Sequence, residues 1–179
     1  MPPDNIPPGK TPADTVPEPL SGAVRVLIED ATRGEVHAQA ALGDMYRKGS
    51  MVQKDDAEAA KWYRRAAEQG DAHAQFNLGA LAMAGRGVAQ DDLEAVTWFR
   101  RAAEQGDALA QFNLGTMLFN GRGAPQDYVE ACMWFNVAAA RGTQMAVSTR
   151  ERIERLMTPI DIYEAHKRAR EWKQAKPAR

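Results

Sequence analysis

The sequence has a single cysteine, Cys132, in 179 residues, which excludes an internal disulfide framework. It also lacks an excess of charge of either sign, because 23 Lys and Arg residues and 24 Asp and Glu residues leave a net charge of −1. Proteins that bind nucleic acid usually carry a clear basic excess, so we expect no nucleic-acid partner. No apolar run approaches the roughly 20 residues that cross a bilayer, so we expect no membrane span.

Export signals are also missing from the N-terminal sequence, where no charged segment precedes an apolar one. A lone cysteine agrees with a reducing compartment. We therefore expect a cytoplasmic protein. A periplasmic location stays open, because a signal or anchor upstream of Met1 would change this expectation.

What the sequence has instead is a repeat of 36 residues. The run Arg-Arg-Ala-Ala-Glu-Gln-Gly-Asp occurs at 64–71 and again at 100–107. Several other positions hold one residue type at the same spacing. They are Gly34, Gly70, Gly106 and Gly142; Gly43, Gly79 and Gly115; Gly49, Gly85 and Gly121; Asp55, Asp91 and Asp127; and Trp62, Trp98 and Trp134.

Each unit is predicted to form two helices, which in the second unit cover about 72–84 and 92–105. Gly85 suits the left-handed residue that ends the first helix. Asp91 suits the N-cap of the second, with Glu94 completing a capping-box pattern. A single hairpin cannot bury its apolar face alone, so the units must stack. The predicted fold class is therefore all-α, an α-solenoid of stacked antiparallel helical hairpins.

The units differ from the segments that flank them. We predict repeats at 35–70, 71–106 and 107–142, a capping helix at 20–33 and C-terminal capping helices at 143–174, with Thr158 as an N-cap. Residues 1–19 hold seven of the ten prolines, so we expect a disordered tail there, acting as a linker or as a proline-rich docking motif. A short tail at 175–179 ends the chain.

The repeated pattern resembles a known family. Ala-Gln-Phe-Asn-Leu-Gly at 74–79 and 110–115, then Gly-Arg-Gly, Asp and Ala-x-x-Trp-Phe-x-x-Ala-Ala, is similar to Sel1-like repeats, relatives of the tetratricopeptide repeat. The resemblance covers about residues 20–172 and implies a right-handed superhelix that works as an adaptor or scaffold. The first unit departs from the pattern, because Ala41 replaces Asn and Met51 replaces the second loop glycine. We expect a changed loop there.

The resemblance raises one enzymatic alternative, because some members are described as β-lactamase-like. The motifs Ser-x-x-Lys, Ser-Asp-Asn and Lys-Thr-Gly of such enzymes do not occur. Cys132 is predicted to be a buried small residue, and His166 a surface residue. His37 and His73 share a repeat position but have no third ligand beside them. The two Gly-Arg-Gly runs are predicted to be turns between helices, not phosphate-binding loops. We expect no catalytic residue, no metal and no cofactor.

The leading hypothesis is a non-enzymatic scaffold that binds a protein or peptide in a concave groove, in bacterial regulation or envelope signalling. The alternative is an accessory structural subunit held permanently in a larger complex; a hydrolase is a remote third. The sequence gives no oligomeric state. The groove is assigned to one stripe on the first helix of each unit, where Asn side chains suit a peptide backbone. Its predicted residues are His37, Ala41, Asp44, Lys48, His73, Asn77, Ala80, Ala84, Leu109, Asn113, Thr116 and Asn120.

Overall fold

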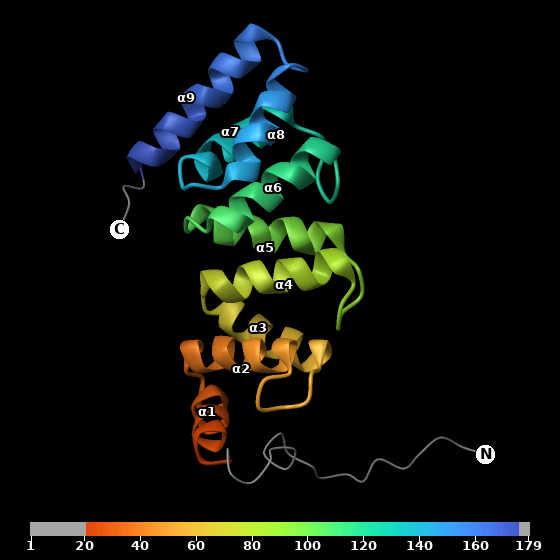
Figure 1. The fold of residues 1–179 in the computed structure, drawn as a ribbon, viewed down its shortest axis with the longest axis vertical. Coiled ribbons are helices and arrows are strands. Elements are labelled where there is room, and N and C mark those ends of the chain that lie inside the picture. The colour runs from red at the N-terminus through yellow and green to blue at the C-terminus, as the bar shows by residue number, and fades with distance from the viewer. Residues whose placement is uncertain (1–20, 176–179) are drawn as a thin grey trace, which may run out of the picture.

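The structure, a computed structural model, describes residues 21–175, and every regular element in this part of the chain is a helix. The helices are α1 (Ser21–Arg33), α2 (Val36–Lys48), α3 (Asp56–Glu68), α4 (Ala72–Ala84), α5 (Asp92–Glu104), α6 (Ala108–Asn120), α7 (Tyr128–Ala139), α8 (Gln144–Glu154) and α9 (Pro159–Ala175). Consecutive helices from α1 to α8 pack against one another and follow one long axis (Figure 1). The predicted all-α solenoid is confirmed.

The predicted tail at 1–19 lies outside the described residues, as do Leu20 and 176–179. Ala175, which was assigned to the C-terminal tail, is instead the last residue of α9. None of the helices within 21–175 is both long enough and apolar enough to cross a membrane.

The helix ends follow from local chemistry, and the second hairpin shows how. Gly85 ends α4 in the left-handed region at φ 64°. The Asp91 carboxylate begins α5 by accepting a hydrogen bond from the backbone N–H of Glu94 at 2.9 Å. The expected capping box is only half formed, because the Glu94 side chain turns away. It accepts from Trp98 Nε1 at 3.0 Å and pairs with Arg64 at 2.7 Å.

Inside each of the three repeats, a glycine of the first helix packs against an aromatic ring of the second helix. A Cβ on Gly79 would lie 3.0 Å from the ring of Phe99, which is fully buried. The absence of a side chain on α4 therefore lets the ring of α5 pack directly on the helix backbone. The same pairing recurs between Gly43 and Tyr63 and between Gly115 and Phe135.

The loops inside the hairpins fasten each unit to the one before it. The Arg86 guanidinium binds the Asp56 carboxylate through contacts of 2.9 to 3.1 Å. Arg122 binds Asp92 in the same way, one repeat later. The predicted turns are therefore confirmed, and their arginines join neighbouring repeats. The expected change in the first loop is wrong, because Met51 adopts φ 65°, close to that of the glycines in the other two loops.

The C-terminal helices α8 and α9 both pack on α7 at one end of the solenoid. Thr158 caps α9, since its hydroxyl oxygen accepts from the backbone N–H of Asp161 at 3.2 Å. Ala165 and Ala169 are buried, and α9 packs on α7. At the far end of α9, the Trp172 ring meets the Trp134 ring edge-on at 5.8 Å.

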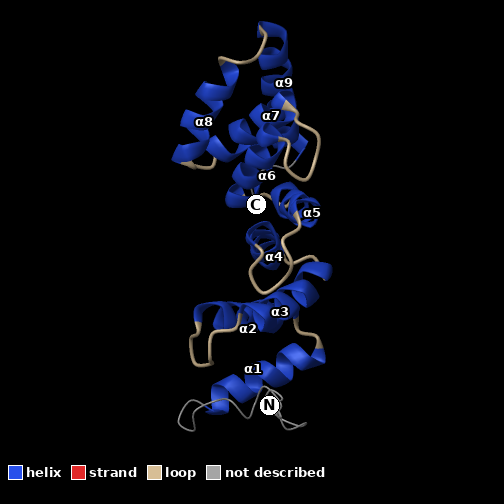
Figure 2. Ribbon diagram, turned by 90° about the vertical axis from the view of Figure 1, so that its right-hand side faces the viewer, coloured by secondary structure: helices blue, strands red, loops and turns tan. Residues whose placement is uncertain are grey.

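The helices form two layers. Figure 2 shows the first helices of the hairpins, including α2, α4 and α8, on one side of the array, and α3, α5 and α7 on the other. In this view α4 and α6 are set back relative to α2 and α8, so the array is concave on that side. We call the surface formed by α2, α4, α6 and α8 the A-helix face.

Candidate functional site

The structure distributes the twelve predicted groove residues over the accessible side of α2, α4 and α6. Most of them are reachable from solvent, and one is buried. His37, Ala41, Lys48, His73, Ala84, Leu109 and Asn120 are exposed; Asp44, Ala80, Asn113 and Thr116 are half-buried; Asn77 is buried.

The amides on this face do not all point outward. Asn77 is only 7% exposed, and its Nδ2 donates to the backbone carbonyl of His73 at 2.9 Å. Asn120 likewise donates to the carbonyl of Thr116 in its own helix, at 2.8 Å. Asn113 differs, because within residues 21–175 no hydrogen bond holds its side chain. Of the two central asparagines, Asn113 is therefore the one with a free amide for a partner.

The N-terminal part of the A-helix face is a charged cluster around Asp44. Its carboxylate accepts hydrogen bonds from the Tyr63 hydroxyl, from Lys48 Nζ at 2.8 Å and from His73 Nε2 at 3.0 Å. The Arg47 guanidinium donates to the Tyr63 hydroxyl at 3.1 Å. Tyr63 occupies the position of Phe99 in the next repeat, so one extra hydroxyl connects this helix pair to the cluster.

These contacts fix the charge states. Burial alone would raise the pKa of Asp44, but the hydrogen bonds from Lys48, Tyr63 and His73 together hold that pKa well below its usual range. Burial, followed by the hydrogen bond to Asp44, raises the pKa of Tyr63. Asp44 is therefore an anion at neutral pH, and it holds cationic side chains in place at one end of the face.

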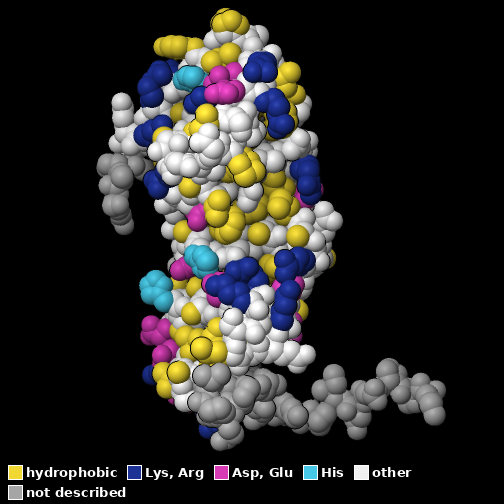
Figure 3. All heavy atoms as spheres, in the orientation of Figure 1, with side chains coloured by type: hydrophobic (Ala, Val, Ile, Leu, Met, Phe, Trp, Pro, Cys, Tyr) yellow, Lys and Arg dark blue, Asp and Glu magenta, His cyan; other side chains and the backbone are white. Residues whose placement is uncertain are grey.

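The middle of the A-helix face is apolar, which the groove prediction missed. Two rings there pack on the buried rings of the second helices: Phe76 on Phe99 with centroids 5.9 Å apart, and Phe112 on Phe135 at 5.7 Å. Figure 3 shows hydrophobic side chains gathered over the middle of this side of the molecule. We define the central apolar patch as the half-buried residues Phe76, Ala80, Met83, Phe112 and Phe119.

A comparison of equivalent positions in the three repeats could have revealed this patch. Its members Met83 and Phe119 stand where the first unit has Arg47, and Ala80 stands where the first unit has Asp44. The surface thus changes from charged to apolar along the array. At the far end it becomes basic again, since the guanidinium of Arg152 on α8 lies 6.0 Å from the centre of the Phe119 ring.

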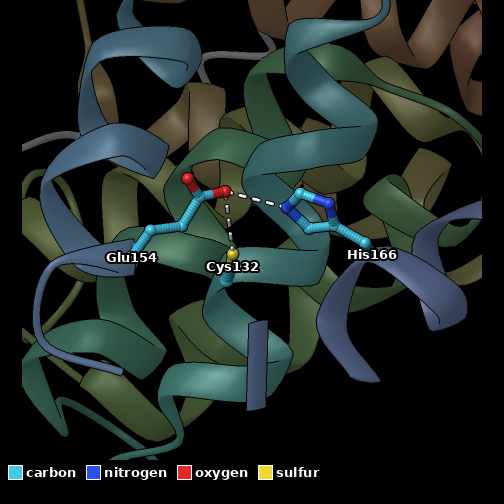
Figure 4. A group of neighbouring side chains, drawn as sticks. All are labelled: Cys132, Glu154 and His166. Atoms are coloured by element: carbon cyan, nitrogen blue, oxygen red, sulfur yellow. Dashed lines mark hydrogen bonds and ion pairs between the residues drawn. The ribbon is translucent and has the colours of Figure 1, made fainter. Parts of the chain in front are cut away.

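A second group of polar side chains lies at the C-terminal end. Cys132 is fully buried, as predicted, but the structure brings Glu154 and His166 next to it (Figure 4). Burial, and then the charge of Glu154, raises the pKa of the Cys132 thiol to about 12. His166, expected at the surface, is half-buried and bonds Glu154 at 2.8 Å. Sequence reasoning treated these residues one by one because Glu154 and His166 lie outside the three repeats.

Comparison with known proteins agrees with this geometry. The Sel1 repeat family matches at residues 36–71, 72–107 and 108–143. A Sel1 repeat protein from Oxalobacter formigenes is 37% identical, with a TM-score of 0.66 over 73% of this chain and 98% of that one. A protective antigen of uropathogenic Escherichia coli, c5321, is 28% identical, with a TM-score of 0.65 over 88% of this chain and 41% of that one.

A more distant structure, Helicobacter pylori cysteine-rich protein B, shares the fold at 19% identity, with a TM-score of 0.57 over 78% of this chain and 97% of that one. No curated protein sequence matches. These three proteins come from bacteria. The three consecutive matches cover more than half of the sequence, and the chain belongs to the Sel1 repeat family.

Proposed function

We propose that this chain is a non-enzymatic scaffold that binds a segment of a partner protein on its A-helix face. Sel1 repeat proteins generally mediate protein–protein interactions. The observation that carries the proposal is the central apolar patch, which lies on the concave side of the array and which no helix within 21–175 covers. A contiguous apolar surface in a concave position is typical of a recognition site.

The chemistry of the face indicates the kind of segment that fits. Apolar side chains would lie on the patch, and the free amide of Asn113 would bind their backbone, since an amide both donates and accepts. Cations border the patch at both ends, with Arg47 and Lys48 at one and Arg152 at the other. We therefore propose an extended segment with an apolar middle and acidic flanks.

The test uses surface substitutions that keep the fold. Ala80 lies between Phe76 and Met83 along α4, and Ala80→Glu adds both bulk and negative charge to the patch. We expect it to abolish binding of an acidic-flanked apolar peptide selected from a peptide library, measured by fluorescence polarisation. Ala80→Arg adds bulk with the opposite charge and should weaken binding less.

Leu93 on α5 supplies the control, because it is exposed and belongs to the opposite layer. Leu93→Glu should leave the affinity unchanged. If Ala80→Glu and Leu93→Glu lower the affinity equally while the melting temperature stays unchanged, the partner does not use the A-helix face.

One observation favours a second function, that of a permanently bound accessory subunit. Large apolar side chains are exposed on α8, on α9 and in the turn between them: Met145, Leu156, Ile160 and Tyr163. An obligate interface would bury such residues. Size-exclusion chromatography of native lysate separates the two functions. A scaffold should elute partly free and exchange partners, whereas an accessory subunit would elute only in one complex of fixed composition.

The biological setting that we propose is bacterial regulation or envelope signalling, since the similar structures come from bacteria. The hydrolase alternative makes a separate prediction, namely turnover of nitrocefin or acylation by labelled penicillin. We expect neither. Activity that survives extensive purification would overturn the non-enzymatic assignment.

A further inference from the structure

Three helices at the C-terminal end bring a thiol, a carboxylate and an imidazole together (Figure 4). Cys132 comes from the middle of α7, Glu154 is the last residue of α8, and His166 lies on α9. The Glu154 Oε1 atom is 2.8 Å from His166 Nε2 and 4.0 Å from Cys132 Sγ, and the three donor atoms all lie within 4.8 Å of one another.

This donor set matches the preferences of one class of cation. Thiolate, imidazole and carboxylate together are typical ligands of zinc and of similar borderline divalent cations. In a tetrahedral zinc site, ligand distances of about 2.0–2.3 Å separate neighbouring donor atoms by about 3.3–3.6 Å. Small rotations of the Glu154 and His166 side chains would therefore bring the three donors to zinc-binding distances.

The three groups differ in how far they are exposed to solvent. The Cys132 side chain is closed off inside the protein, whereas Glu154 and His166 are 23% and 38% exposed. A cation would therefore reach the sulfur past the carboxylate and the imidazole. Three protein ligands leave a fourth position, which water would fill.

We propose that Cys132, Glu154 and His166 form a binding site for a zinc-class divalent cation. Binding releases the thiol proton to solvent, so that the reaction is Cys–SH plus Zn²⁺ giving a Cys–S–Zn unit and one proton. The proton that His166 Nε2 shares with Glu154 moves to Nδ1 by way of solvent, so that the hydrogen bond between the two side chains is exchanged for two bonds to the metal. Because the ligands come from α7, α8 and α9, the cation ties the final hairpin to the last helix.

The positive charge of one neighbouring residue, Arg150, would weaken metal binding, and its removal provides a further test of the site. Arg150 Nε lies 3.5 Å from Glu154 Oε1, and it is buried without a hydrogen-bond partner within 21–175. Arg150 also reaches Asn136 Oδ1 at 3.4 Å. A bound cation would repel this guanidinium, whose side chain is 28% exposed. Removing its charge should therefore strengthen metal binding.

The experiment measures Zn²⁺ binding to the full chain by competition with a chromophoric chelator. Cys132→Ala should fold normally, because the equivalent position of the first repeat is Ala60. We expect this variant to bind about 100-fold more weakly than the wild type and His166→Gln at least about tenfold more weakly. Arg150→Gln should bind about tenfold more tightly. His73→Gln is the control and should bind as the wild type does.

Two further readouts separate this site from adventitious surface binding. With Co²⁺ in place of Zn²⁺, the wild type should show a thiolate-to-cobalt charge-transfer band that Cys132→Ala lacks. Zn²⁺ should also raise the melting temperature of the wild type but not that of Cys132→Ala or His166→Gln. Equal Zn²⁺ affinity in the wild type and Cys132→Ala, or a cobalt spectrum without the thiolate band, would overturn the proposal.

Discussion

Gly87 lies directly against the backbone of Asp56, the first residue of the helix that begins one repeat earlier. A Cβ on Gly87 would stand 2.1 Å from the Asp56 carbonyl oxygen, and the backbone there has φ 69°. This contact allows the loop of the second hairpin to lie on the start of α3, where Arg86 binds the Asp56 side chain. The close fit of this loop on α3 therefore depends on the absence of a side chain at Gly87.

We predict that Gly87→Ala destabilises the protein by about 3 kcal/mol or more, because the new Cβ must push two repeats apart. The matched control is Gly70→Ala. Gly70 also has a positive φ, 98°, but nothing lies within 4 Å of the position that a Cβ would take. Gly70→Ala should therefore destabilise the protein by only about 1–2 kcal/mol. Urea denaturation measures both. Equal losses would mean that backbone conformation alone, rather than the contact, explains the glycine.

Met51 provides the converse prediction. It adopts φ 65° where the other two repeats have glycine, and it is exposed. A side chain in the left-handed region carries strain, which glycine would remove. We expect Met51→Gly to stabilise the protein by about 1 kcal/mol, measured by thermal or urea unfolding. A loss of stability would indicate that the Met51 side chain makes contacts that outweigh the strain.

Asp44 should make stability depend on pH in the acid range. Its pKa is lower in the folded protein than its usual value of 3.8, so the folded state holds this carboxylate in its charged form more strongly than the unfolded chain does. The resulting stability is fully present above about pH 4–5 and is lost as the pH falls toward the lowered folded-state pKa. The free energy of unfolding, measured at a series of pH values between neutral pH and about pH 2, should therefore depend less on pH for Asp44→Asn than for the wild type. Parallel curves for both proteins would rule out this contribution.

Much of the fold was predictable because its determinants are local. Gly85 and Asp91 define the ends of α4 and α5 through their own backbone and side-chain chemistry, and the period of 36 residues transfers these boundaries to the other units. The Gly87 contact could not be found in this way. A turn glycine and a glycine against a neighbouring repeat look alike in sequence.

The candidate sites were less predictable, for two physical reasons. The polarity of the A-helix face depends on which side chains turn inward, and Asn77 turns into its own helix, whereas Asn113, at the same repeat position, does not. The residue one turn earlier also differs, His73 in one case and Leu109 in the other. At the C-terminal end, His166 meets Cys132 because α9 crosses α7, a contact that no repeat spacing encodes.

The asparagine difference gives the last prediction. Asn113→Ala removes an amide that has no hydrogen bond within residues 21–175, so the melting temperature should hold while capture of a peptide ligand weakens by about 1 kcal/mol, roughly five- to tenfold. Asn77→Ala should have little effect on capture, because its Nδ2 already donates to the His73 carbonyl. Binding assays and thermal melts of both variants check this. Equal and unchanged capture for both would show that the partner backbone does not use these amides, and stronger loss for Asn77→Ala would mean that this side chain turns outward when the partner binds.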